Sequence, residues 1–217
     1  MKTADVIIVG SGASGLFNAL FLPQDYKVIV ITKKEVEESD SFLAQGGISA
    51  LKNPEDYDSY FEDTMKAGHY ENDKGAVEKM IKESPQIIQD LKDFGVRFDL
   101  KDGEIEFTRE GGHSTFRILH HEDLTGKEIT SHLYEEAKKR DNITIMENCT
   151  MIDIIEKDGE CKGIVYKDAD GNLDTIEAPD TVLATGGLGG LFKHSTNFRH
   201  LTADSLAAVS YTHLRAH

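Results

Sequence analysis

The 217-residue chain carries 39 acidic and 24 basic side chains, giving a formal net charge of −15 at neutral pH. This negative charge disfavours non-specific binding to nucleic acid or anionic lipid. No apolar run approaches the roughly 20 residues of a membrane span, and the start lacks the features of a signal peptide. Cys149 and Cys161 provide neither a disulfide framework nor metal-ligand spacing. We therefore expect a cytoplasmic globular protein without a metal site and without a membrane partner.

The first thirty residues predict a βαβ unit. Residues 5–10 form an apolar run that ends in glycine, residues 13–22 have helical character before Pro23, and residues 27–31 form a second apolar run. Continuous apolar runs of this length are typical of strands buried on both faces of a parallel sheet. Residues 32–49 show few helix signals and are expected to form a loop.

The middle of the chain predicts three helices and a long polar segment. Residues 55–68 and 73–94 have helical spacing of apolar side chains, and Gly95 is a stop signal. Residues 97–124 are rich in glycine, charge and histidine, which indicates a polar excursion. A capping box with Thr125 as N-cap and Glu128 reaching back predicts a helix to residue 139. The expected apolar face of the second helix consists of Ala76, Val77, Met80, Ile81, Ile87, Ile88 and Leu91.

The last third predicts two more strands of the parallel sheet with an antiparallel meander between them. Residues 143–146 and 181–184 are short apolar strands, and residues 150–178 contain three alternating segments separated by glycine turns. A helix is expected within residues 185–208. Residues 210–217 (SYTHLRAH) lack a closing element, so we expect one domain over residues 1–208 and a non-native or truncated tail over 209–217.

Three glycines follow the first predicted strand in a G-x-G-x-x-G pattern. Gly10 permits a tight turn, Gly12 lets a pyrophosphate approach the backbone, and Gly15 allows close packing of helix and strand. The helix N-terminus offers free N–H groups and a positive dipole end to the phosphates. This context, rather than the triplet alone, predicts dinucleotide binding.

The acidic residue that usually binds the ribose is displaced. It should lie at the end of the second strand, near Thr32 or Lys33, but the nearest carboxylate is Glu35. Either Glu35 reaches back, or Thr32 and Lys33 hold the ribose or adenine. The glycine motif alone does not choose the cofactor.

Later segments favour a flavin. Gly46 and Gly47 are adjacent in a loop where backbone can pass closely under a flat ring, and the meander precedes the final strand as in flavoproteins. Together, DVIIVGSGASGL, SFLAQGGI, TREGGHS, LHHEDLTGKEI and VLATGGLGGLF resemble the succinate dehydrogenase, fumarate reductase and L-aspartate oxidase flavoprotein family over residues 4 to 208. The resemblance implies an α/β, Rossmann-like FAD-binding domain with an inserted meander and the truncated start of a capping region.

The resemblance also implies which residues contact FAD. Asp204 stands where the family usually has Gly-Asp-Gly, but here the triplet is Ala203-Asp204-Ser205. The complete set of implied FAD contacts is Gly10, Ser11, Gly12, Ala13, Ser14, Gly15, Lys33, Asp40, Ser41, Phe42, Leu43, Ala44, Gln45, Gly46, Gly47 and Asp204.

Two features favour the L-aspartate oxidase branch of this family. Asp40 occupies the position of the histidine that binds FAD covalently in the membrane-complex members, so FAD is expected to be non-covalent. Glu110 matches the glutamate that the branch uses to orient aspartate, plausibly through its α-ammonium. The alternative for Glu110 is a surface ion pair with Arg109. His113 is either an active-site neighbour or a hydrogen-bonded loop residue, and His120 and His121 lack the spacing of a zinc site.

The branch oxidises L-aspartate to iminoaspartate, with oxygen or fumarate as electron acceptor, and supplies quinolinate synthase in de novo NAD synthesis. Two alternatives remain: a soluble fumarate reductase or succinate-oxidising flavoprotein, and a non-catalytic nucleotide-binding module. The family's capping-domain arginine and histidines are expected beyond residue 217. We therefore expect the chain alone to be inactive on aspartate and to bind FAD weakly.

Overall fold

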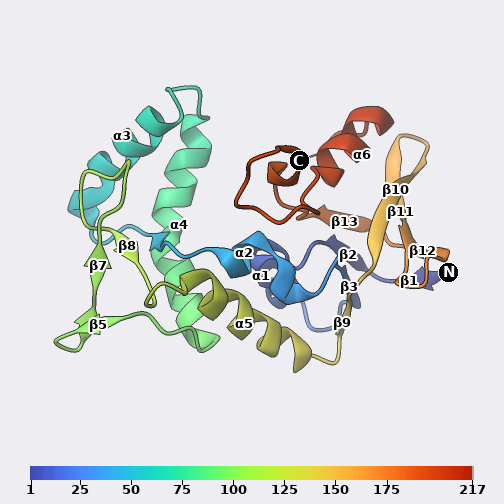
Figure 1. The fold of residues 1–217 in the computed structure, drawn as a ribbon, viewed down its shortest axis with the longest axis horizontal. Helices are drawn as coiled ribbons and strands as arrows, with labels where there is room; N and C mark the ends of the chain where they lie inside the picture. The colour runs from blue at the N-terminus through green and yellow to red at the C-terminus, as the bar shows by residue number, and fades with distance from the viewer. Residues whose placement is uncertain (217) are drawn as a thin grey trace. The chain divides into compact units, whose positions relative to one another are not determined.

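The computed structural model describes residues 1–216, which divide into two compact units. The first unit contains residues 1–43 and the chain from residue 130 onward, and the second contains residues 44–129. Figure 1 shows the course of the chain through both units. Within residues 1–216, no helix combines the length and apolar character needed to cross a membrane.

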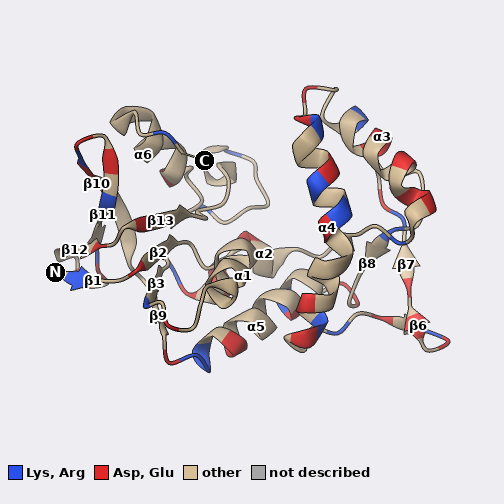
Figure 2. Cartoon of the chain, turned by 180° about the vertical axis from the view of Figure 1, so that it is seen from behind, with Lys and Arg blue, Asp and Glu red and all other residues tan. Residues whose placement is uncertain are grey.

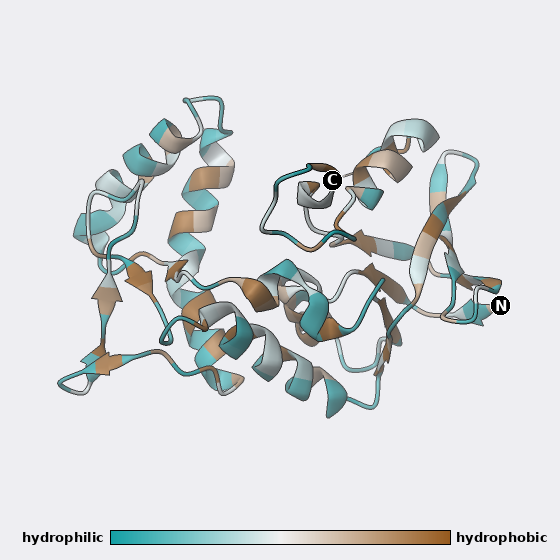
Figure 3. Ribbon diagram, viewed as in Figure 1, coloured by the Kyte–Doolittle hydropathy of each residue, from teal (hydrophilic) through white to brown (hydrophobic). Residues whose placement is uncertain are grey.

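A four-stranded parallel sheet forms the centre of the first unit. β2 (Val6–Val9) and β3 (Val28–Ile31) are buried along their whole length, as their continuous apolar runs predict, and they are among the brown segments of Figure 3. Helix α1 (Ala13–Phe21) connects them and ends before Pro23. The strand order is β13 (Asp180–Leu183), β2 (Val6–Val9), β3 (Val28–Ile31) and β9 (Ile143–Met146). The predicted βαβ unit and both later strands are confirmed.

Different elements pack on the two faces of this sheet. Ile8 and Val30 point to the face on which Ala19 of α1 packs, whereas Ile7 and Ile29 point to the opposite face. Burying each of these side chains contributes about 1.5–3 kcal/mol relative to exposure. Both faces of the sheet are therefore closed by apolar contacts.

The predicted meander covers the second face. It consists of β10 (Thr150–Lys157), β11 (Glu160–Lys167) and β12 (Leu173–Glu177), paired antiparallel, with β1 (Lys2–Thr3) parallel to β12. Ile154, Ile164 and Ile176 pack in one core cluster with the parallel sheet. Asp158 and Gly159 both have positive φ angles, 57° and 79°, as a tight hairpin turn requires.

The second unit contains helices, short strands and the polar excursion of residues 97–124. The helical elements are η2 (Pro54–Asp56), α3 (Tyr57–Ala67) and α4 (Lys74–Asp93), and α4 ends before Gly95, whose φ is +90°. The excursion contains four short strands instead of an unstructured loop. Its two sheets are β4 (Ile48–Ser49), β8 (Ile118–Leu119) and β7 (Phe107–Thr108), and the pair β5 (Leu100–Lys101) and β6 (Glu104–Ile105).

The buried face of α4 is narrower than predicted. Ala76 and Met80 are exposed, and Ser84 is buried instead, where its hydroxyl donates to the Ile81 carbonyl and accepts from Leu51 N–H. The opposite face carries alternating charges, visible in Figure 2. Periodicity alone overstated the apolar stripe because it cannot show how much of a helix its neighbours cover.

Three local predictions are corrected. The capping box is wrong: α5 (Thr125–Lys138) begins at Thr125 itself, whose hydroxyl accepts from His121 N–H, and Glu128 accepts from Arg97. The loop at 32–49 contains η1 (Val36–Glu38) and α2 (Asp40–Leu43). The expected helix at 185–208 is replaced by η3 (Gly189–Leu191), a loop and α6 (Asp204–Thr212), because four glycines at 186–190 disfavour a helix. α6 extends into the expected tail, whose origin stays a prediction.

Candidate functional site

A cavity of about 460 Å³ lies in the first unit, at the carboxyl ends of its parallel strands. Its wall includes the chain segments that follow β2, β3 and β13, together with the start of α6. Loops at the carboxyl ends of parallel strands form the usual nucleotide crevice in this type of sheet. The volume is in the range of small-molecule sites.

Two of the three predicted glycines, Gly10 and Gly12, lie in the wall of this cavity, and Gly15 packs behind it. A Cβ atom on Gly10, whose φ is +115°, would lie 2.1 Å from the carbonyl oxygen of Ala184. A Cβ on Gly15 would lie 2.0 Å from the carbonyl oxygen of Gly10, so helix and strand touch there through backbone alone. Gly12 lies in the wall, with Ser41 Oγ 3.0 Å from the place of its missing Cβ. The structure therefore leaves no room for side chains at Gly10 and Gly15.

Hydroxyl groups fix the start of α1. Ser41 Oγ accepts a hydrogen bond from the backbone N–H of Ala13, at 3.1 Å. Ser11 Oγ donates to Thr32 Oγ1 at 2.8 Å, and this contact is buried. The glycine loop is thereby tied to the end of β3, where a ribose-binding acid usually lies.

Lys33 and Asp204 meet in the cavity wall although they are far apart in sequence. Lys33 Nζ lies 2.9 Å from Asp204 Oδ2 and also donates to Thr202 Oγ1 at 2.8 Å and to the His200 carbonyl at 2.9 Å. Ala203 has φ 59°, a left-handed conformation that favours glycine. An alanine therefore adopts a left-handed conformation at the position where the resemblance to the family implies a glycine.

Asp40 anchors a second loop beside the same cavity. Its carboxylate accepts from Phe198 N–H at 3.0 Å and from the Asn197 side-chain amide. A carboxylate has no ring nitrogen with which to bond the flavin covalently. These hydrogen bonds instead hold residues 197–198 against Asp40, which lies in the cavity wall.

Several predicted contacts take other positions. The part of the first unit that the structure describes includes four implied FAD contacts that do not line this cavity: Ala13, Gly15, Phe42 and Leu43. Glu35 is exposed and also lies outside the cavity wall. Glu38 lines the wall in its place, because η1 carries the chain back towards the cavity. Sequence reasoning also missed the wall residues Ser39, Cys149, Met151, His200, Leu201 and Leu206.

The second unit has its own cavity, of about 390 Å³, lined by Gln45, Gly46, Thr108, Glu110, His120, Glu122 and Asp123. Glu110 Oε1 accepts from the backbone N–H of Gly47 at 3.2 Å, and a Cβ on Gly46 would lie 3.2 Å from both carboxylate oxygens. The alternative, an ion pair with Arg109, is not the contact that the structure records, since Arg109 lies over the Phe116 ring. Glu110 therefore lies directly against the double glycine.

Ala44 is placed close to this cavity by a backbone contact. Its carbonyl accepts from Gly126 N–H at 2.9 Å. Gly47 is equally confined, because a Cβ there would lie 2.3 Å from the Leu119 carbonyl oxygen. The double-glycine loop is thus locked against β8 and the start of α5.

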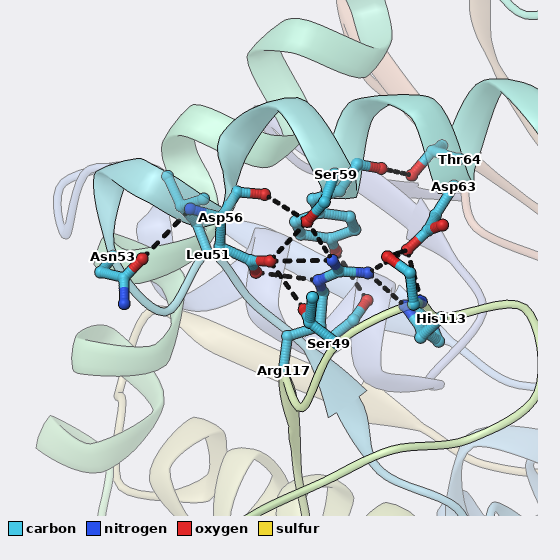
Figure 4. A network of polar contacts seen from close by, with 12 residues as sticks. Ser49, Leu51, Asn53, Asp56, Ser59, Asp63, Thr64, His113 and Arg117 are labelled. Carbon is cyan, nitrogen blue, oxygen red and sulfur yellow. Dashed lines mark hydrogen bonds and ion pairs between the residues drawn. The ribbon is translucent and has the colours of Figure 1, made fainter.

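A buried arginine, missed by the sequence analysis, organises the segment that follows Glu110 (Figure 4). The Arg117 side chain is completely buried and contacts Asp56 through two parallel bonds of 2.9 and 2.8 Å. Its Nη1 lies 2.6 Å from Asp63 and 3.1 Å from His113 Nδ1. His113 is therefore a hydrogen-bonded loop residue in this network. The partners lie 54 and 61 positions apart, so no local pattern indicated them.

The network changes the ionisation of its members. The hydrogen bond from Arg117 holds the pKa of Asp56 far below its usual value. Burial acts to raise the pKa of Asp63, but hydrogen bonds from Ser114 and Arg117 outweigh it, and the pKa is lowered. Asp56 in turn raises the pKa of Arg117. All three groups are charged at neutral pH, which fixes residues 113–117.

The sequence and fold of the chain both match known flavoproteins. Residues 5–216 match the family described as FAD binding domain. The chain belongs to this family. The fold predicted from the sequence is confirmed, because the chain superposes on a variant of E. coli quinol fumarate reductase FrdA with a TM-score of 0.91 and 27% identity, covering 96% of this chain and 37% of that one.

Curated relatives refine the placement. The chain is 44% identical to an L-aspartate oxidase of Clostridium perfringens over 96% of its length, and 46% identical to that of Clostridium acetobutylicum over 94%. It spans about half the length of these relatives, 47% of each. The predicted homology to L-aspartate oxidases and the predicted cofactor, FAD, are confirmed.

Proposed function

We propose that this protein is an L-aspartate oxidase, which converts L-aspartate to iminoaspartate with FAD as the immediate electron acceptor. Oxygen or fumarate would then reoxidise the flavin. The identity of 44–46% to curated L-aspartate oxidases supports this assignment. Because the chain spans about half of those relatives, the activity is a proposal about the whole enzyme.

Glu110 is the observation that carries the proposal. Its carboxylate contacts the backbone at Gly46 and Gly47 and lines a cavity with two further carboxylates, Glu122 and Asp123. An α-ammonium group would gain a charge-assisted hydrogen bond there, worth about 1.5–3 kcal/mol. Succinate and fumarate have no ammonium group, so this cavity favours an amino acid over a plain dicarboxylate.

The residues of the first cavity fit the nucleotide part of FAD. Gly10 and Gly12 bring bare backbone to the cavity beside the N-terminus of α1, where a pyrophosphate is stabilised by N–H groups and the helix dipole. Lys33 supplies positive charge in the same wall. FAD supplies the two-electron chemistry, and the chain supplies binding and orientation. Asp40 supports a non-covalent cofactor. The proposed FAD contacts are residues 10–15, Lys33, residues 40–47 and Asp204.

A soluble fumarate reductase or succinate-oxidising flavoprotein is the second candidate. The TM-score of 0.91 with E. coli quinol fumarate reductase FrdA favours it. The two candidates predict different substrates for the same cavity. Glu110 distinguishes them because its negative charge would repel a carboxylate placed where an ammonium is expected.

The deciding experiment compares flavin reduction by L-aspartate and by succinate under anaerobic conditions. It uses this chain and the complete product of the reading frame that encodes it, each loaded with FAD. We expect reduction by aspartate and not by succinate in the complete product. Reduction by succinate alone would overturn the proposal.

A variant at Glu110 tests the observation itself. Glu110→Gln should raise the KM for aspartate on the order of 10- to 100-fold, since it removes one charge-assisted bond. Glu104→Gln, on an exposed strand outside the cavity, is the matched control and should leave KM unchanged. An unchanged KM in Glu110→Gln would contradict the role of this carboxylate.

We also propose a place in de novo NAD synthesis, with the product passing to quinolinate synthase. A cytoplasmic location is part of the same proposal, and the free thiols of Cys149 and Cys161 are compatible with a reducing compartment. Co-purification of quinolinate synthase activity with the tagged protein would test the partnership.

A further inference from the structure

His120 lies in the wall of the Glu110 cavity with an ordered carboxylate behind it. Asp99 Oδ2 is 3.2 Å from His120 Nδ1. Asp99 is itself fixed, because its Oδ2 accepts from Glu122 N–H at 2.8 Å and its own N–H donates to the His120 carbonyl at 2.8 Å. An aspartate beside one ring nitrogen of histidine orients the ring and determines which nitrogen carries the proton.

The other ring nitrogen has no hydrogen-bond partner among residues 1–216. His120 Nε2 is buried and makes no hydrogen bond within the part of the chain that the structure describes. Leaving a buried polar atom unsatisfied costs about 1–3 kcal/mol. Because His120 lines the cavity, a ligand group there that hydrogen-bonded to Nε2 would remove this cost.

Oxidation of an amino acid requires a proton acceptor. The nitrogen of a protonated α-ammonium has no lone pair with which to form the C=N bond when hydride leaves Cα. A general base works best when its pKa lies near the working pH, which favours imidazole over the carboxylates in the same cavity. His120 is the only imidazole among the cavity residues that the structure describes.

We propose that His120, oriented by Asp99, accepts the proton of the substrate's α-ammonium group, while Glu110 holds that group in place. The N–H electron pair stays on nitrogen and forms the C=N bond as hydride passes from Cα to FAD. The proton is then on Nε2, and the product is protonated iminoaspartate. This inference rests on the proposed function and assigns it a catalytic base.

The charges around His120 are predominantly negative. They attract the substrate's ammonium group to the cavity that His120 lines. The titratable groups that lie around it are Asp99 and His121, with Glu128 beyond His121, and the cavity residues Glu110, Glu122 and Asp123.

The first test examines the histidine without turnover. In nitrogen-15 NMR of the labelled chain, neutral His120 should carry its proton on Nδ1 and leave Nε2 free, with the signal assigned by its loss in His120→Gln. In Asp99→Asn, the amide can donate to Nδ1, so the proton should move to Nε2. A wild-type ring with the proton on Nε2 would overturn the proposal whatever the activity of the protein.

The second test measures flavin reduction by aspartate as a function of pH in the complete product. His120→Gln should slow reduction on the order of 100-fold at neutral pH. The loss should shrink at high pH, where free aspartate already has an unprotonated amine. His194→Gln, at an exposed position, is the control.

The outcomes separate this inference from the proposed function. If wild-type protein oxidises aspartate and His120→Gln has the same pH profile, the base is assigned wrongly and the proposed function stands. If wild-type protein does not oxidise aspartate, the proposed function fails. A parallel loss at every pH would indicate a structural role for His120 and would also overturn the inference.

Discussion

The cavities of the two units differ in the chemical groups that line them. In the first unit, strands buried on both faces bring glycine backbone to the cavity, beside the paired charges of Lys33 and Asp204, and the core is apolar. In the second unit, carboxylates line the cavity, and a completely buried arginine with two aspartates holds the neighbouring segment. The first arrangement suits a cofactor that is bound mainly through its phosphates, and the second suits recognition of a small charged group.

This difference determines which substitutions each unit tolerates. The glycine loop of the first cavity is sensitive to added volume, because a Cβ on Gly10 would overlap the neighbouring backbone. A charge-lined cavity is sensitive to loss of a partner, because the remaining buried charge is left uncompensated. The following predictions test that contrast.

The largest effect is expected from Arg117→Met. It leaves Asp56 and Asp63 without their cation and should lower the free energy of unfolding of the second unit by about 3–5 kcal/mol. Hydrogen exchange resolved by segment would locate the loss. Arg97→Met is the matched control: Arg97 is 72% exposed, so solvent screens its pair with Glu128 and the unfolding free energy should stay nearly unchanged.

The same variant has a pH signature. Folding lowers the pKa of Asp56 and Asp63, so their contribution to stability is present above their unfolded pKa of about 4 and is lost as pH falls towards the lowered values. The difference in unfolding free energy between wild type and Arg117→Met should therefore shrink below about pH 4. A constant difference across this range would contradict a role for the ion pairs.

Gly10→Ala should have the next largest effect, this time in the first unit. The new Cβ would lie 2.1 Å from the Ala184 carbonyl oxygen at a φ of +115°. We expect a loss of about 3 kcal/mol in unfolding free energy and loss of FAD binding, measured by thermal unfolding and flavin fluorescence. Gly187→Ala, which has open space around its Cβ position, should behave as wild type. Equal losses in both variants would refute the steric explanation.

The smallest effect is a gain. Ala203→Gly relieves a left-handed conformation at φ 59° and should raise the unfolding free energy by about 1 kcal/mol. Ala207→Gly, inside helix α6, should instead lower it by about 1 kcal/mol. Thermal melts of the two variants would show shifts of opposite sign. A lower melting temperature for Ala203→Gly would contradict the assigned strain.

The fold of the first unit could be predicted largely from the sequence. Its strands are apolar runs whose length and flanking glycines are local properties, and hydrophobic burial acts on them whatever their partners are. The glycine triplet likewise reports a local backbone requirement at residues 10–15. The predicted helix at 185–208 is wrong because the four glycines at 186–190 lose too much conformational freedom in a helix.

Among the site residues, the sequence determined those that belong to a local motif, such as Gly10, Gly12 and Glu110. Only the tertiary structure brought Lys33 to Asp204, replaced Glu35 by Glu38 in the cavity wall, and paired Arg117 with Asp56 and Asp63. It also placed Asp99 beside His120. The physical reason is that charge pairing depends on distance in space, and no periodicity in the chain records which distant side chains will meet.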